Sequence, residues 1–349
     1  MTTDSTPAPS PANPGYEDRV LGCLLGTMAG DAHGLLRAAG DDPSAALADP
    51  ASLAVSDATH LTLYTVDGLI EALEWANDGV AADETACLWL SYLRWLGRQG
   101  EHLPPNAPAA PARWLDRQED LLPVHDPDAD TVRALLTGEM GTQARPLNPR
   151  AEGPGALMRS APFGLVPRIP ASMVERLTIE AAALTHGTAA ARSTAALFSN
   201  VIRSLAIEGV SLDEAVSAAR GEEHHLADGA GHDGAAALSA GEAAVASHGG
   251  GSAAAGRTAA GTFEAALQAV LEAGAGASSP RDQLAAALAH AAGAGRPDAS
   301  PVVASSVAGA IIGALHGTAA VPSAYLSASG VPHVVRTMAR TLLSATTGS

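Results

Sequence analysis

Four glycines spaced four residues apart near the N-terminus place the strongest constraint on the fold. Gly22, Gly26, Gly30 and Gly34 lie within the segment DRVLGCLLGTMAGDAHG, residues 18–34. On a helix this spacing puts all four on one face, where the absence of side chains lets a neighbouring backbone approach closely. Apolar residues flank the glycines on both sides. The segment therefore predicts a helix that is buried on most of its circumference.

The composition favours helices along the rest of the chain. Of the 349 residues, 47% are hydrophobic but only 3% are aromatic, and alanine is abundant. Alanine loses no side-chain entropy in a helix, and no convincing strand-like alternation occurs. We expect an all-α, compact multi-helix single domain over residues 16–349. The preceding residues 1–15 are rich in Pro, Ala and Ser and are expected to be a disordered tail.

Helical spacing and breaker residues divide the domain into elements. Helices are expected at 18–34, 56–77, 83–97, 130–138, 262–273, 281–292, 301–315 and 334–343, with two more between 170 and 208. Irregular segments are expected at 35–55, with one short turn of helix within it, and at 101–115 and 142–155. The stretch 221–261 is rich in Gly, Ala and His, and part of it is expected to be a mobile loop.

Charge and cysteine content restrict the partners. The net charge of −17 argues against binding to nucleic acid, because a phosphate backbone would be repelled. Cys23 and Cys87 lie in apolar helical patterns and are expected to be buried free thiols, which fits a reducing cytoplasm. No apolar run approaching the roughly 18 residues of a membrane span and no N-terminal leader is evident. We expect a cytoplasmic protein with no nucleic-acid or membrane partner.

Five segments, in order, resemble the signatures of the ADP-ribosylglycohydrolase family. The first helix matches the family pattern G-x-x-L-G-x-x-x-G-D-A-x-G through Gly22, Leu25, Gly26, Gly30, Asp31, Ala32 and Gly34. Residues 56–60 stand where the family has Thr-Asp-Asp-Thr-Gln, and 155–159 resemble its G-A-L-M-R loop. Thr185-His186 and the helix 307–315 resemble two later landmarks. Together the landmarks span residues 18–317 and imply the all-α family fold.

The resemblance implies a site for two Mg²⁺ ions, which the family holds with Thr-Asp-Asp at one helix start and Asp-Thr-Asp-Thr at another. Oxygen ligands suit such hard cations. The corresponding positions here are Ser56, Asp57 and Ala58 at the first helix and Ser300, Val302 and Val303 at the second. Alanine and valine offer no side-chain oxygen. We therefore expect these positions to be vestigial, with no intact metal site and no bound cofactor.

The ligand loop of the family is better preserved than its metal site. The expected ligand-binding residues are Gly153, Gly155, Ala156, Met158, Arg159 and His186. Backbone N–H groups of the loop could cradle a pyrophosphate, and His186 could donate a hydrogen bond to it. Pro154 replaces a usual asparagine and removes one donor. The alternative is that the loop is retained only for packing.

Two other groups of residues could bind a metal ion. Asp31, His33, Asp57 and His60 could meet at one end of the first two helices and hold a transition metal. The alternative is ordinary hydrogen bonding at helix ends. The run of acidic and histidine residues at 222–233 also has suitable side chains, although a solvated loop explains it equally simply.

These observations favour a catalytically inactive member of the family that binds ADP-ribose, a related nucleotide or a protein partner. A second hypothesis is an active hydrolase of glycosidic bonds that uses substitute ligands, such as Asp298. A third is a structural or regulatory scaffold without any ligand.

Overall fold

The computed structural model describes residues 13–221 and 256–347, and no β-strand occurs among them. The expected all-α fold is confirmed. Its α-helices are α1 (Tyr16–Ala39), α2 (Ala45–Ala48), α3 (Asp57–Asn77), α4 (Glu84–Arg98), α5 (Ala129–Leu135), α6 (Ala171–Ala183), α7 (Ala189–Arg203), α9 (Ala259–Gly274), α10 (Pro280–Gly293), α11 (Pro301–His316) and α12 (Val331–Thr347). Residues 212–221 are also helical.

Short helices of other types connect these elements. They are the 3-10 helices η1 (Pro50–Ser52), η2 (Leu115–Arg117), η3 (Leu157–Arg159), η4 (Ala161–Leu165), η6 (Gly317–Ala319) and η7 (Ser323–Leu326), and the π-helix η5 (Ser204–Glu208). The predicted mobile loop at 221–261 lies largely outside the described residues, as do the first twelve residues of the expected tail.

The boundary expected between the first helix and the irregular segment 35–55 is wrong, whereas the short turn of helix expected within that segment is present. The first helix continues past Gly34 to Ala39 and ends at Gly40, whose φ of 81° is left-handed and whose N–H donates to carbonyls of the last turn. Helices α2 and η1 then occupy much of the remaining segment. The run of Gly and Asp residues therefore ends the helix later than the glycine stripe alone suggested.

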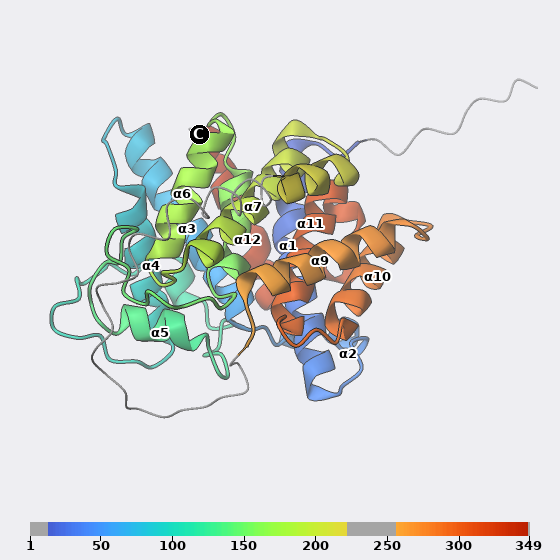
Figure 1. Cartoon of the computed structure of the whole chain (residues 1–349), viewed down its shortest axis with the longest axis horizontal. Coiled ribbons are helices and arrows are strands. Elements are labelled where there is room, and N and C mark those ends of the chain that lie inside the picture. The colour runs from blue at the N-terminus through green and yellow to red at the C-terminus, as the bar shows by residue number, and fades with distance from the viewer. Residues whose placement is uncertain (1–12, 222–255, 348–349) are drawn as a thin grey trace, which may run out of the picture.

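Helices α1 and α11 form the centre of the molecule (Figure 1). They run antiparallel, because Gly22 lies against Gly313 and Gly317 while Gly34 lies against Val302. A Cβ atom added at Gly22, Gly26, Gly30 or Gly34 would lie closer than 3.0 Å to backbone atoms of the opposite segment. The glycine stripe is thus the contact surface between these two helices, as the sequence predicted.

The remaining helices are arranged around this pair. In Figure 1, α9 and α10 lie on one side of α1 and α11, and α3, α4 and α6 lie toward the other. Helix α12 packs against both α1 and α3. One continuous apolar core includes side chains from α1, α3, α4, α7, α9, α11 and α12. Both cysteines are buried free thiols, as expected.

Helix α11, with the short η6 that follows it, is long and apolar enough to cross a membrane by length and composition alone. Residues Pro301–Ala319 have a mean hydropathy of 1.5, which is apolar enough for a membrane span. However, 72% of that window is buried inside the protein, mostly because α1 covers it. The expectation that no such run exists was therefore wrong. The apolar composition of α11 is explained by its position as a central, mostly buried helix.

We predict that Gly26→Ala strongly destabilises the protein. The added Cβ would collide with the carbonyl group of Gly309, which is backbone and cannot rotate away. Overpacking of this kind should lower the free energy of unfolding by about 2–3 kcal/mol, measured by urea denaturation.

Gly97→Ala is the matched control, because Gly97 also lies in a helix but a Cβ there meets nothing within 4 Å. This variant should raise the free energy of unfolding by up to about 1 kcal/mol through helix propensity. Equal effects of the two substitutions would contradict the role of the stripe.

Candidate functional site

The carboxylate of Asp31 organises the start of α3. Asp31 is fully buried on α1, and it accepts hydrogen bonds from the hydroxyl and backbone N–H of Ser56 at 2.6 and 2.9 Å. It also accepts from the backbone N–H and hydroxyl of Thr59 at 3.1 and 2.5 Å. Burial raises the pKa of Asp31, and these hydrogen bonds oppose the rise. Asp31 therefore serves as a cap supplied to α3 by another helix.

The start of α11 offers few oxygen atoms. Ser300 is its N-cap and lies beside Thr262 of α9, whose hydroxyl accepts a hydrogen bond from the Ser300 N–H at 3.0 Å. Pro301, Val302 and Val303 form the first turn, and Val303 is buried. This helix start carries hydrocarbon where the related family motif carries carboxylates.

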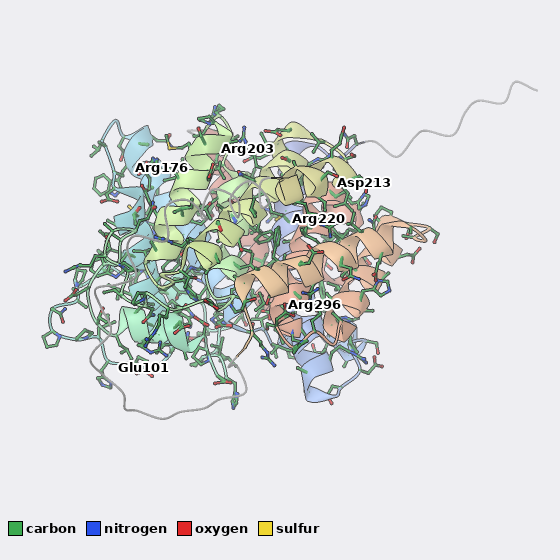
Figure 2. All side chains as sticks on the ribbon, viewed as in Figure 1. Glu101, Arg176, Arg203, Asp213, Arg220 and Arg296 are labelled. Carbon is green, nitrogen blue, oxygen red and sulfur yellow. The ribbon has the colours of Figure 1, made fainter. Side chains whose placement is uncertain are left out.

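Asp298, the substitute ligand considered from the sequence, is held by a neighbour. Its carboxylate accepts hydrogen bonds from the guanidinium of Arg296 at 3.1 and 3.2 Å. Arg296 is labelled in Figure 2. The hydrogen bond from Arg296 lowers the pKa of Asp298. The carboxylate is therefore ionised and paired with an arginine.

These residues do not fit a pair of Mg²⁺ ions. Asp31 accepts four hydrogen bonds from α3, and Ala58, Val302 and Val303 have no ligand atoms. Within the ranges 13–221 and 256–347, no three side chains of His, Cys, Asp or Glu are grouped so that they could hold a metal ion. The alternative of a transition metal on Asp31, His33, Asp57 and His60 is thus not supported by the geometry.

The buried side chain of Arg159 holds the loop 153–159 in place. It is 1% exposed, and its guanidinium donates to the Thr185 hydroxyl at 2.7 Å and stacks over the ring of Tyr92 at 4.4 Å. Met158 is also buried, and its carbonyl accepts from the Thr62 hydroxyl at 3.0 Å. The two side chains therefore point into the fold, where they fix the shape of the loop.

Two backbone N–H groups of the loop, those of Gly155 and Ala156, are buried and lack an acceptor among the described residues. In the described part of the chain, no carbonyl accepts a hydrogen bond from the N–H of Gly155 or Ala156. The loop is attached to α9 through the Glu152 carbonyl, which accepts from the Ala259 N–H at 2.8 Å. The loop therefore holds two unpaired, buried donors in a fixed backbone.

His186 and Asp128 lie beside this loop. The Nε2 atom of His186 is 3.6 Å from a carboxylate oxygen of Asp128, and a Cβ on Gly155 would lie 2.8 Å from the His186 ring. His186 is fully buried, and its Nε2 has no hydrogen-bond partner among the described residues. The structure thus places His186 beside Gly153, Gly155 and Ala156 of the loop.

A chain of hydrogen bonds reaches Nδ1 of His186 and is compatible with a proton on Nε2. The Thr185 hydroxyl accepts from Arg159 and lies 2.8 Å from Nδ1 of His186, to which it can donate its own proton. Burial lowers the pKa of His186, so the ring is neutral. In this arrangement Nε2 carries the proton, is enclosed by the protein, and lies on the side of the ring that faces Asp128.

Asp128 was missed by the sequence analysis. It is the N-cap of α5, where its carboxylate accepts from the Thr131 N–H and hydroxyl, and its own N–H donates to Asp57 at 2.6 Å. Burial, followed by the nearby charge of Asp128, raises the pKa of Asp57 to about 7. The Asp-Pro-Asp-Ala-Asp run at 126–130 was the available signal, since Asp before a short helix is a typical cap.

His60 lines a cavity on the other side of the α3 N-terminus. The cavity has a volume of about 790 Å³, and neither the loop 153–159 nor His186 lines it. His60 is 2% exposed, and burial lowers its pKa to about 4. His60 and Asp57 therefore belong to different surroundings despite their proximity in the sequence.

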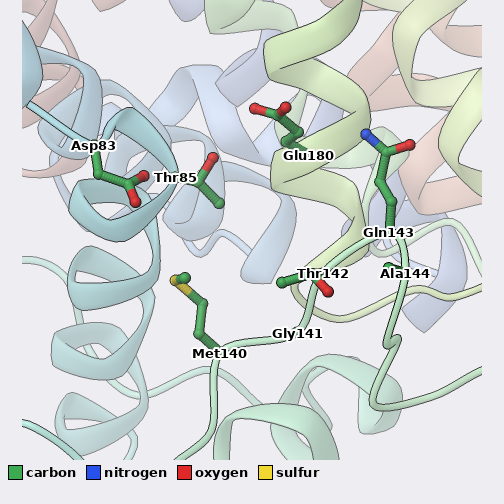
Figure 3. A pocket seen from close by; sticks show the side chains of 8 residues that line it. All are labelled: Asp83, Thr85, Met140, Gly141, Thr142, Gln143, Ala144 and Glu180. Atoms are coloured by element: carbon green, nitrogen blue, oxygen red, sulfur yellow. The ribbon is translucent and has the colours of Figure 1, made fainter.

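A smaller cavity of about 370 Å³ lies between α4 and α6 (Figure 3). Asp83 and Thr85 line it from the start of α4, Glu180 lines it from α6, and residues 140–144 complete it. None of the residues predicted as binding or metal positions lines this cavity, so it does not belong to the predicted site.

The fold and the site together define a class of protein: an all-α protein with a polar site between helix N-termini and a glycine-containing loop. A family model described as ADP-ribosylglycohydrolase matches residues 12–349. The chain belongs to the ADP-ribosylglycohydrolase family, as its sequence motifs predicted.

A solved structure described as an ADP-ribosylglycohydrolase-related protein complex is similar to this chain at a TM-score of 0.56 and 20% sequence identity. The similarity covers 95% of this chain and 99% of the other. At this identity the likeness shows the fold alone. No curated protein matches the sequence significantly.

We predict that His60 makes the protein sensitive to acid. Its pKa of about 4 lies below the usual 6.5, so the unfolded chain binds a proton between these values while the folded protein does not. The stability that neutral His60 allows is therefore complete above pH 6.5 and is lost as the pH falls toward 4. His60→Phe should reduce the loss of unfolding free energy between pH 7.5 and 5 by about 2 kcal/mol.

Urea denaturation of both proteins at the two pH values measures this difference. His333→Phe provides a control on the solvent-exposed side of α12. An identical pH dependence for wild type and His60→Phe would show that His60 does not titrate as its burial requires.

Proposed function

We propose that this protein is a non-hydrolysing member of its family that binds ADP-ribose or a related nucleotide without magnesium. The observation that carries the proposal is the contrast between the two halves of the site. The helix starts that would hold metal ions offer hydrocarbon and already occupied oxygen atoms. The loop 153–159, in contrast, contains two buried N–H groups, of Gly155 and Ala156, that lack an acceptor among the described residues.

The donors match a pyrophosphate. The backbone N–H groups of Gly155 and Ala156 and the Nε2 of His186 are buried and have no acceptor among the described residues, a cost that a pyrophosphate entering between them would remove. Neutral donors of this kind bind phosphate oxygens when a rigid backbone holds them in place. Arg159 adds a positive charge behind the loop without contacting the ligand itself.

The acceptors match the ribose part of a nucleotide. The carboxylates of Asp57 and Asp128 lie beside the loop and repel phosphate, but they accept hydrogen bonds from hydroxyl groups. A ligand that combines phosphate and ribose hydroxyls satisfies both halves of the site. Inorganic phosphate alone does not, and we expect it to bind more weakly.

The site lacks the means to hydrolyse a glycosidic bond in the manner of a dinuclear magnesium enzyme. Two divalent ions need several oxygen ligands, and the first turn of α11 supplies none from Val302 or Val303. Asp298 remains paired with Arg296. Binding is therefore the function that the remaining groups can perform.

Isothermal calorimetry with ADP-ribose tests the proposal in buffer with magnesium and in buffer with a chelator. We expect saturable binding with the same affinity in both. Gly155→Ala should weaken it by about tenfold or more, because the new Cβ would occupy space between Asp128 and His186. Gly97→Ala, remote from the site, should leave the affinity unchanged.

Three results would overturn the proposal. Binding that requires magnesium, together with release of ADP-ribose from a modified substrate, would support the active hydrolase. Absence of binding in both buffers would support a scaffold or a protein-binding role. Equal affinity for ADP-ribose and inorganic phosphate would show that the carboxylates do not accept hydrogen bonds from the ribose hydroxyls.

A further inference from the structure

We propose that the 790 Å³ cavity beside α2 is a binding site for a small organic cation with a large apolar body. This site is separate from the proposed nucleotide site. The C-terminal turns of α1, the segment 41–56 and the loop 119–125 form its walls, together with His60 and Val331. Its volume lies within the range of about 300–1,000 Å³ that is typical of small-molecule sites.

The walls of the cavity are mainly apolar. They include Leu35, Leu53, Val55, Val124 and Val331. Leu122, which is 71% exposed, also lines the cavity and is the most exposed large hydrophobic side chain described. An exposed leucine beside an apolar hollow gains burial when a hydrophobic body fills the space.

The charge of the lining selects the sign of the ligand. Among residues 13–221 and 256–347, four carboxylates line the cavity and no arginine does, although arginines occur elsewhere in the chain. The acidic residues are Asp41, Asp49, Glu119 and Asp120, all on the exposed side. Their combined field attracts a cation and repels phosphates and carboxylates. A nucleotide is therefore excluded here, in contrast to the site at the loop 153–159.

His60 supplies a polar contact in the interior of the cavity. Its side chain is 2% exposed, and no described residue forms a hydrogen bond with its ring nitrogens. The ring nitrogens of His60 keep a small accessible surface although they have no hydrogen-bond partner among the described residues. Because His60 lines the cavity, that surface faces the cavity. A neutral imidazole in this position can exchange one hydrogen bond with a ligand without adding charge.

The acidic rim of the cavity thus favours a positively charged group, and the apolar interior favours a hydrophobic body. A ligand with an ammonium group near Glu119 and Asp120 and an aromatic or aliphatic body against Val55 and Val124 fits both. Ser56 also lines the cavity, but its hydroxyl already donates to Asp31. The selectivity therefore comes from the acidic rim and His60.

Calorimetry with three matched probes tests this inference on the full chain at pH 7.5. The probes are naphthylmethylammonium, naphthylmethanol and naphthoate, which share one ring system and differ in head-group charge. We expect the ammonium to bind most tightly, the alcohol more weakly, and the carboxylate weakest of all. Failure of all three probes to bind at millimolar concentration, or equal binding of ammonium and carboxylate, would overturn the proposal.

Variants locate the binding in the cavity. The double variant Glu119→Gln, Asp120→Asn should weaken the ammonium by about three- to tenfold and leave the alcohol unchanged, because only the rim charge is lost. Ala54→Trp should weaken both by at least about tenfold, because its exposed position lets a large ring enter the cavity without disturbing the core. His60→Phe should weaken both by about threefold through the lost hydrogen bond.

Asp213→Asn is the control for charge. Asp213 is exposed at the upper right of Figure 2, far from α2 at the bottom of the same view. It should not change the affinity for any probe. An equal loss of ammonium binding in this variant and in the rim variant would attribute the attraction to the net charge of the protein and overturn the assigned site.

Discussion

The backbone contact between α1 and α11 determines where the polar groups of this protein lie. Gly26 faces Gly309, and Gly30 faces Ser305 and Ser306, so the two helix axes are held at a separation that no side chain could allow. Asp31 follows Gly30 directly and is fully buried as a result. From this position its carboxylate reaches Ser56 and Thr59 and fixes the start of α3. A close helix contact thus sets the position of a helix cap on a third helix.

The same contact explains how the first turn of α11 can lack polar groups without loss of the fold. Gly34 lies against Val302, and Val303 is buried, so the start of α11 is held by packing and by the Ser300 cap. A cluster of unpaired carboxylates at this point would repel one another and favour unfolding in the absence of metal ions. Valine removes that cost. The substitution pattern is therefore consistent with a site that keeps its shape without cations.

The sequence predicted the helices better than the surroundings of individual side chains. Glycine spacing, caps and apolar periodicity are local properties, and they located nearly every long helix within a few residues. The direction of the Arg159 side chain could not be predicted in this way. Its place in a loop motif does not reveal that it points inward onto Tyr92. Asp128 was missed for a similar reason. Its position beside Asp57 depends on a contact across 71 residues, for which a single sequence has no signal.

The α3 N-terminus separates the two environments for which we propose ligands of opposite charge. On one side, the buried N–H groups of Gly155 and Ala156 lie unpaired near His186. On the other, His60 lines a cavity to which the described residues contribute four carboxylates and no arginine. One turn of helix separates Ser56 from His60, and Asp31 fixes the first of these residues. A ligand on either side would therefore lie beside the same helix start. The buried carboxylate of Asp31 keeps that helix start rigid.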